Sequence, residues 1–97
     1  MHPKPEDIMQ SKVTIEICNS WGYYPRLMYV ESILAEKYPD LDFEDIVVKG
    51  WSGTFKITLT KNGKSKVIHS KLNGDGFVTP SNLNEFLAKF EAAYSSM

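Results

Sequence analysis

The dipeptide Asn62-Gly63 lies between two segments in which apolar and polar residues alternate. Alternation is typical of a strand with one buried face, and Asn-Gly favours the tight turn of a hairpin because both turn residues adopt positive φ. We therefore predict an antiparallel hairpin, with His69 as a partly exposed strand residue. The turn fixes the expected pairs of facing residues: Thr58 with Val67, Ile57 with Ile68, and Lys56 with His69.

The residues before the hairpin predict a strand, a helix and a second strand. Polar and apolar residues alternate over 13–17, and the dense apolar run Ile46-Val47-Val48 lies within a strand expected at 41–49. Pro25 suits the first turn of the intervening helix, where its missing N–H costs nothing. A strand–helix–strand connection is right-handed and makes the two strands parallel. The expected buried stripe of this helix is Leu27, Val30, Leu34 and Tyr38.

The last quarter of the chain predicts a glycine-rich loop and a final helix. The loop covers residues 71–78, and Thr79 and Pro80 suit the N-cap and the first helical position. The element order becomes β-α-β-β-β-α. It predicts an α/β (α+β), thioredoxin-like fold with a four-stranded mixed sheet and two helices. We expect a flexible tail over 1–12 and one domain over 13–97. The apolar stripe of the final helix is Leu83, Phe86, Leu87, Phe90 and Ala93.

Composition excludes several classes of protein. The chain has 97 residues with one cysteine and a formal net charge of −1. One cysteine excludes an internal disulfide scaffold, and the near-neutral charge argues against nucleic-acid or membrane binding. Two distant histidines and one cysteine do not make a metal site, so we expect none. The N-terminus lacks an apolar signal stretch, and we expect a cytoplasmic monomer.

Cys18 occupies the position where the first strand ends and a helix is about to begin. The N-terminus of a helix presents free N–H groups and a partial positive charge, which stabilise a thiolate, and Arg26 is a further cation nearby in sequence. The alternative is a lone cysteine that acts as a small buried apolar residue. The position between strand and helix favours the reactive interpretation.

Two segments of the chain carry specific patterns. In residues 18–26, Cys18 is followed by Gly-Tyr and then by Pro with a basic residue. The second segment joins residues 67–71 and 74–78. Together they resemble the selenoprotein W family, also called the Rdx family. The resemblance covers about residues 13–93. It implies a cytosolic redox protein linked to glutathione, with partner proteins of the 14-3-3 type, that acts through a thiol or selenol at two motif positions.

Trp21 departs from the family motif. The family carries selenocysteine or a second cysteine at this position, and a tryptophan forms neither a selenenylsulfide nor a disulfide. Two explanations stay open. This chain has abandoned chemistry with two reactive residues, or Trp21 stands for a selenocysteine whose UGA codon differs from the tryptophan codon UGG by one base. The codon in the gene decides between them.

Two functions follow as hypotheses. In the first, Cys18 is the nucleophile of a glutathione-linked thiol redox protein, and no cofactor is bound. The absence of proline from residues 50–53 argues against general disulfide reductase activity. In the second, the chain is a non-enzymatic module that docks proteins through aromatic loops near Cys18, although Trp51 and Phe77 would equally close the end of the core. The candidate binding residues are Asn19, Ser20, Tyr23, Trp51 and Phe77.

Overall fold

A computed structural model describes residues 11–97 of the chain, so residues 1–10 of the tail expected at 1–12 lie outside the described residues. The first strand begins at Ser11, two residues before the alternating pattern predicts. The elements in chain order are β1 (Ser11–Cys18), α2 (Tyr23–Lys37), β2 (Asp42–Val48), β3 (Phe55–Lys61), β4 (Lys64–Ser70), the short 3₁₀ helix η1 (Lys71–Asn73) and α3 (Leu83–Ser96).

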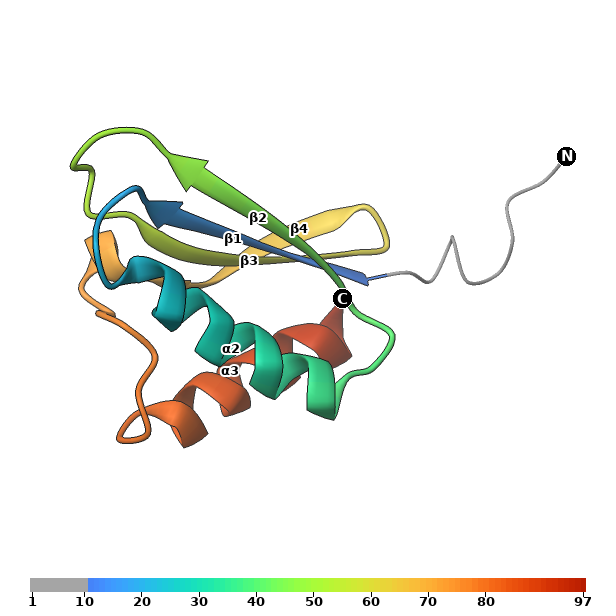
Figure 1. The fold of residues 1–97 in the computed structure, drawn as a ribbon. Helices are drawn as coiled ribbons and strands as arrows, with labels where there is room; N and C mark the ends of the chain where they lie inside the picture. Colours follow the sequence, from blue (N-terminus) through green and yellow to red (C-terminus); the bar gives the residue numbers. More distant parts are fainter. Residues whose placement is uncertain (1–10) are drawn as a thin grey trace, which may run out of the picture.

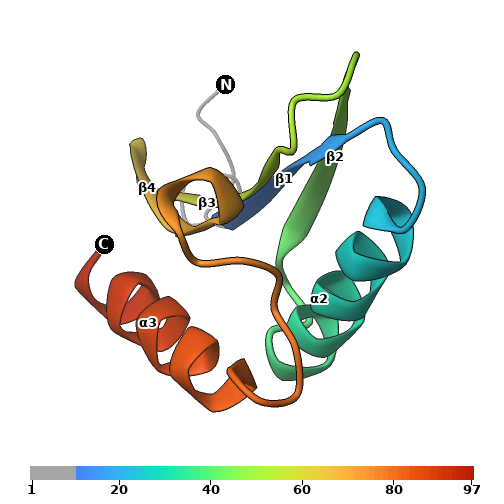
Figure 2. The ribbon, with the colours of Figure 1, turned by 90° about the vertical axis from the view of Figure 1, so that its left-hand side faces the viewer.

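The four strands form one mixed sheet in the order β2-β1-β3-β4. β1 and β2 are parallel, as the strand–helix–strand connection predicts, and the pairs β1–β3 and β3–β4 are antiparallel. Both helices lie on the same side of the sheet, and none of the described elements covers the opposite face (Figures 1 and 2). The molecule is thus a two-layer sandwich that matches the predicted four strands and two helices.

The core fills the space between the sheet and the helices. The central strands β1 and β3 bury every second residue, which is why their sequences alternate. The stripe predicted for α2 is buried at three of its four positions, and Tyr38 lies partly buried at the end of the helix. The side chains with no exposed surface are Val13, Ile15, Leu27, Leu34, Phe55, Ile57, Leu59 and Phe90.

The hairpin register is correct near the turn and wrong beyond it. Thr58 faces Val67 as predicted, but Ile57 faces His69 and Lys56 faces Ser70. The register shifts between Ile57 and Thr58, so β4 contains one additional residue at this point. This is the arrangement of a β-bulge, which bends and twists the strand that carries it. The predicted pairs of Ile57 with Ile68 and of Lys56 with His69 are therefore wrong.

His69 is buried, in contrast to the partly exposed position that the regular hairpin predicts. Its side chain is 4% exposed, and its ring lies edge-on to the rings of Phe55 and Phe86. Nε2 lies 2.8 Å from the carbonyl oxygen of Gly76, which accepts a hydrogen bond when Nε2 carries the proton. The bulge turns the end of β4 inward, so Ile68, His69 and Ser70 are all buried.

The last helix begins later than the sequence predicts. Thr79 is not its N-cap, because α3 starts at Leu83 and residues 80–82 form a turn. The side chain of Asn82 stabilises this turn: its Oδ1 accepts a hydrogen bond from the N–H of Thr79, and its Nδ2 donates one to the carbonyl of Phe77. Neither helix of the described residues has the length and apolar character needed to cross a bilayer.

Candidate functional site

Cys18 is the last residue of β1, and a loop from the neighbouring strands covers it. The Cys18 N–H donates to the carbonyl of Thr54 at 2.7 Å, and the Asn19 N–H donates to the carbonyl of Val48 at 3.0 Å. These two bonds hold the segment after β1 against the loop that joins β2 to β3. The Cys18 side chain is only 2% exposed. The predicted position between a strand and a helix is therefore confirmed, and the thiol lies beneath a thin cover.

The Cys18 sulfur has hydrogen-bonding partners on both sides. Sγ lies 3.0 Å from the hydroxyl of Ser20 and 3.2 Å from the carbonyl oxygen of Gly50. A carbonyl oxygen accepts a hydrogen bond from a thiol and cannot donate one to a thiolate, whereas a serine hydroxyl is able to donate to a thiolate. The contact with Gly50 therefore suits the protonated thiol, and the contact with Ser20 suits the thiolate.

Hydrogen bonds lower the pKa of Cys18 below its ordinary value. The largest cause is the hydrogen bond from the Ser20 side chain; burial acts in the opposite direction, and bonds from the backbone of Gly53 and from Ser52 lower the pKa further. The Thr54 hydroxyl donates to the Ser52 hydroxyl at 2.8 Å, which leaves the Ser52 proton free for the sulfur. Arg26, expected as a nearby cation, is not among these causes.

The connection from Cys18 into α2 depends on one glycine. Gly22 directly precedes the helix and has φ of 87°, a left-handed conformation that other residues adopt only with strain. Its conformation lets the chain reverse within four residues of Cys18 and begin α2 at Tyr23. Tyr23 is thus the first residue of the helix, and the expectation that this candidate binding residue belongs to an aromatic loop near Cys18 is wrong.

Two exposed tryptophans flank the covered thiol. Trp21 is 99% exposed and Trp51 is 89% exposed. Each directly follows a residue whose oxygen contacts Sγ, namely Ser20 and Gly50. Because its side chain is exposed, Trp51 does not close the end of the core, and that predicted structural role is wrong for this residue. Beside Trp21 lies an open hollow of about 390 Å³, lined by Asn19, Ser20, Trp21, Gly22, Tyr24 and Pro25.

Phe77 closes the end of the core, which is the structural role that the sequence left open for it. Its ring packs edge-on against Tyr23 and Phe55, with centroids 5.1 and 5.4 Å apart. Two cations lie over the same ring, the Arg26 guanidinium at 4.8 Å and the Lys71 ammonium at 5.6 Å. Cation–π contacts of this kind hold both charges at the end of the sheet where Cys18 lies.

The sequence missed the residues that cover the thiol. Gly50, Ser52 and Gly53 supply three of the groups around Sγ, but the sequence shows them only as a break after β2. The parallel pairing of β1 and β2 was the available signal, because the carboxyl ends of parallel neighbours meet at one edge of a sheet. Within residues 11–97, no group of three or more His, Cys, Asp or Glu side chains is placed to hold a metal ion.

Comparisons with known proteins agree with this architecture. A family model of the Rdx family matches residues 12–89. Selenoprotein W of Gallus gallus is 32% identical over 87 residues, which cover 88% of this chain and 98% of that protein. Selenoprotein W of Danio rerio is 30% identical, covering 88% and 96%. A thioredoxin-like protein from Bacillus cereus has a TM-score of 0.59 at 17% identity, covering 87% and 92%, and confirms the predicted fold.

Proposed function

Because the chain belongs to the Rdx family, the family of selenoprotein W, we propose that it is a thiol redox protein whose reactive group is Cys18. The family and the thioredoxin-like fold support a redox-type function in general. The observation that carries the proposal is the set of donors around Sγ, led by the Ser20 hydroxyl at 3.0 Å, which lowers the pKa of Cys18. A thiolate is the nucleophilic form of cysteine.

Glutathione is the redox partner that we propose. The Cys18 thiolate attacks the glutathione sulfur of a mixed disulfide between glutathione and a partner protein, that disulfide breaks, and the partner's thiolate leaves and takes a proton from water. A glutathione thiolate then attacks the Cys18 mixed disulfide at the glutathione sulfur, which releases Cys18 and forms glutathione disulfide, so the partner thiol is reduced and glutathione is oxidised. Arg26 and Lys71, held over Phe77, are cations that suit the carboxylates of glutathione. We propose the reducing cytosol as the compartment for this chemistry.

Access to Cys18 requires movement of the loop that covers it. The sulfur is almost fully buried, and the carbonyl of Gly50 lies directly against it. Gly50 and Gly53 both have positive φ, at 88° and 71°, so the loop turns sharply on either side of Trp51 and Ser52. We propose that residues 50–53 swing away from Sγ before attack, and that the exposed Trp51 is the part of the loop that a substrate contacts first.

The test uses the one cysteine of the chain. Incubation with glutathione disulfide should add a single glutathione, seen by intact mass, and later addition of reduced glutathione should remove it. The Cys18→Ser variant should gain no mass. Protein that stays unmodified while folded and becomes modified only in denaturant would contradict the proposal, because the thiol would then be a buried structural residue.

A second candidate function is protein docking without chemistry, and the two exposed tryptophans favour it. Tryptophan is enriched at the centres of protein interfaces, and Trp21 and Trp51 are almost completely free of contacts. We propose a 14-3-3-type protein as the first partner to test. Pull-down with Cys18→Ser and with Trp51→Ala separates the two functions: docking without chemistry needs Trp51 and not the thiol.

A further inference from the structure

The outer edge of β4 is a second surface of the molecule, separate from Cys18. β4 is the last strand of the sheet and lies on the side of α3 (Figure 2). A groove of about 440 Å³ runs along it. Five consecutive residues, Lys66–Ser70, line the groove on the strand side, and Lys89 and Ala92 line it on the α3 side. Because side chains of a strand alternate in direction, a groove that touches five in succession follows the strand's edge.

The backbone of this edge has free hydrogen-bonding groups. Lys61 and Lys64 close a two-residue turn, and pairs in an antiparallel ladder alternate between bonded and non-bonded types. The pairs of Ser65 with Thr60 and of Val67 with Thr58 are therefore the non-bonded ones. The hydroxyls of Ser65 and Thr60, 2.9 Å apart, agree with the short spacing of such a pair. The N–H and C=O groups of Ser65 and Val67 thus point away from β3.

The far end of the edge shows how a strand would pair there. Asp75 binds both backbone groups of Ser70: its Oδ2 accepts from the Ser70 N–H at 2.9 Å, and its own N–H donates to the Ser70 carbonyl at 3.1 Å. One residue of the chain already occupies the place of a neighbouring strand. The edge from Ser65 to Val67 has no such cover among the described residues, and Val67 is 45% exposed.

The charge of the groove indicates which kind of partner would bind there. Two lysines, Lys66 and Lys89, and one carboxylate, Asp75, line it; Asp75 is bound to the Ser70 backbone, and neither lysine forms an ion pair within 4 Å among residues 11–97. A second copy of β4 would bring Lys64 and Lys66 against their own equivalents, so lysines on an edge oppose self-pairing. We propose that the free edge of β4 binds an extended acidic peptide segment, which adds to the sheet as a fifth strand and places its carboxylates against Lys66 and Lys89.

The test uses a fluorescein-labelled peptide of about eight alternating Glu and Val residues, a length suited to a single strand. Fluorescence anisotropy should show saturable binding, and amide NMR shifts should centre on residues 65–67. Val67→Pro removes an outward N–H without breaking the ladder to β3, and should weaken binding about tenfold. Val67→Ala keeps the N–H and should bind like the unchanged protein.

Charge reversal gives a second arm. The double variant Lys66→Glu with Lys89→Glu should weaken binding about tenfold, whereas Lys37→Glu, the same change at the end of α2, should have no effect. Methylating alternate peptide amides should abolish binding, and this arm holds if Val67→Pro fails to fold. The proposal would be overturned if binding is not saturable, or if the methylated peptide binds equally well. It would also be overturned by NMR shifts confined to the loops around Cys18, or by a concentration-dependent dimer through β4.

Discussion

At the scale of single residues, the chemistry of the chain centres on the sulfur of Cys18. The sequence predicted this residue and its place between strand and helix. It did not predict that Ser20 would be the main group acting on the sulfur, or that Gly50 and Ser52 would lie against it. Contacts within four residues follow from local geometry, whereas the loop after β2 reaches Cys18 only through the pairing of distant strands.

Removal of the Ser20 hydroxyl should raise the pKa of Cys18. Ser20→Ala deletes the donor at 3.0 Å from Sγ, which is the largest cause of the lowered pKa. The rate of alkylation by iodoacetamide, followed against pH, reports the pKa of the only cysteine. Ser32→Ala, which removes a hydroxyl bonded to the backbone of α2, is the control. Identical profiles for the Ser20 variant and the control would refute the role of Ser20.

Trp21→Cys should restore a two-residue redox motif. The Trp21 side chain is 99% exposed, so we expect its loss to change stability little. The new cysteine lies three residues after Cys18, in the turn before α2, and oxidation should form an intramolecular disulfide. Mass spectrometry after thiol blocking measures it, with Trp51→Cys as the comparison. A variant whose two thiols both stay free under mild oxidant would contradict the expected geometry.

At the scale of elements, the hairpin shows which part of its strand register can be predicted from the sequence and which part cannot. Asn62-Gly63 predicts the turn and the pair of Thr58 with Val67, because register is fixed outward from the turn. The bulge farther along cannot be predicted from the turn. It arises where Ile68 and His69 are both buried, and this depends on the packing of Phe55 and Phe86. The delayed start of α3 has a similar origin in the side-chain bonds of Asn82.

His69→Phe should destabilise the fold by about 1 kcal/mol, the net value of a typical hydrogen bond. Phenylalanine has a similar ring and keeps the edge-on contacts with Phe55 and Phe86, but it cannot donate to the Gly76 carbonyl. Urea unfolding measures the change in free energy. An unchanged midpoint would show that the bond between His69 and the loop before α3 contributes nothing to stability.

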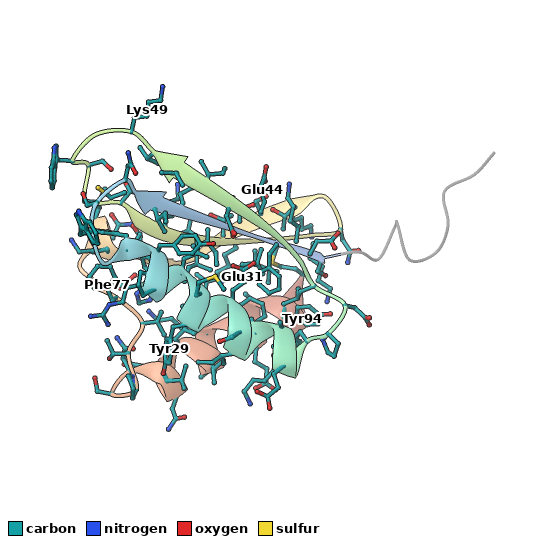
Figure 3. All side chains as sticks on the ribbon, in the orientation of Figure 1. Tyr29, Glu31, Glu44, Lys49, Phe77 and Tyr94 are labelled. Carbon is teal, nitrogen blue, oxygen red and sulfur yellow. The ribbon has the colours of Figure 1, made fainter. Side chains whose placement is uncertain are left out.

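At the scale of the whole molecule, helices cover one face of the sheet, and no element within residues 11–97 covers the other. This arrangement half-buries the side chain of Glu31, which lies between α2 and the sheet (Figure 3), and its buried Oε2 has no hydrogen-bond partner among the described residues. Burial, followed by the negative charge of Asp45, raises the pKa of Glu31. Compared with the unfolded chain, the folded state therefore makes ionisation of Glu31 less favourable.

Glu31→Gln should make the fold more stable at neutral pH. A carboxyl with a raised pKa in the folded state stabilises the fold when protonated, and this contribution is lost as pH rises through the folded pKa. The stability gained by the variant should consequently grow between acid and neutral pH. Urea unfolding at several pH values tests this, with Glu36→Gln at an exposed position of α2 as the control. A gain that does not depend on pH would contradict the assignment.

The most direct test of the central claim is the pKa of Cys18 in the folded protein, compared with the same thiol in denaturant. The thiolate absorbance followed through a pH titration gives both values, because the chain has one cysteine. The hydrogen bonds from Ser20, Ser52 and Gly53 predict that the folded value is lower. A folded value equal to or above that of the denatured chain would contradict the proposal that Cys18 is the reactive thiol.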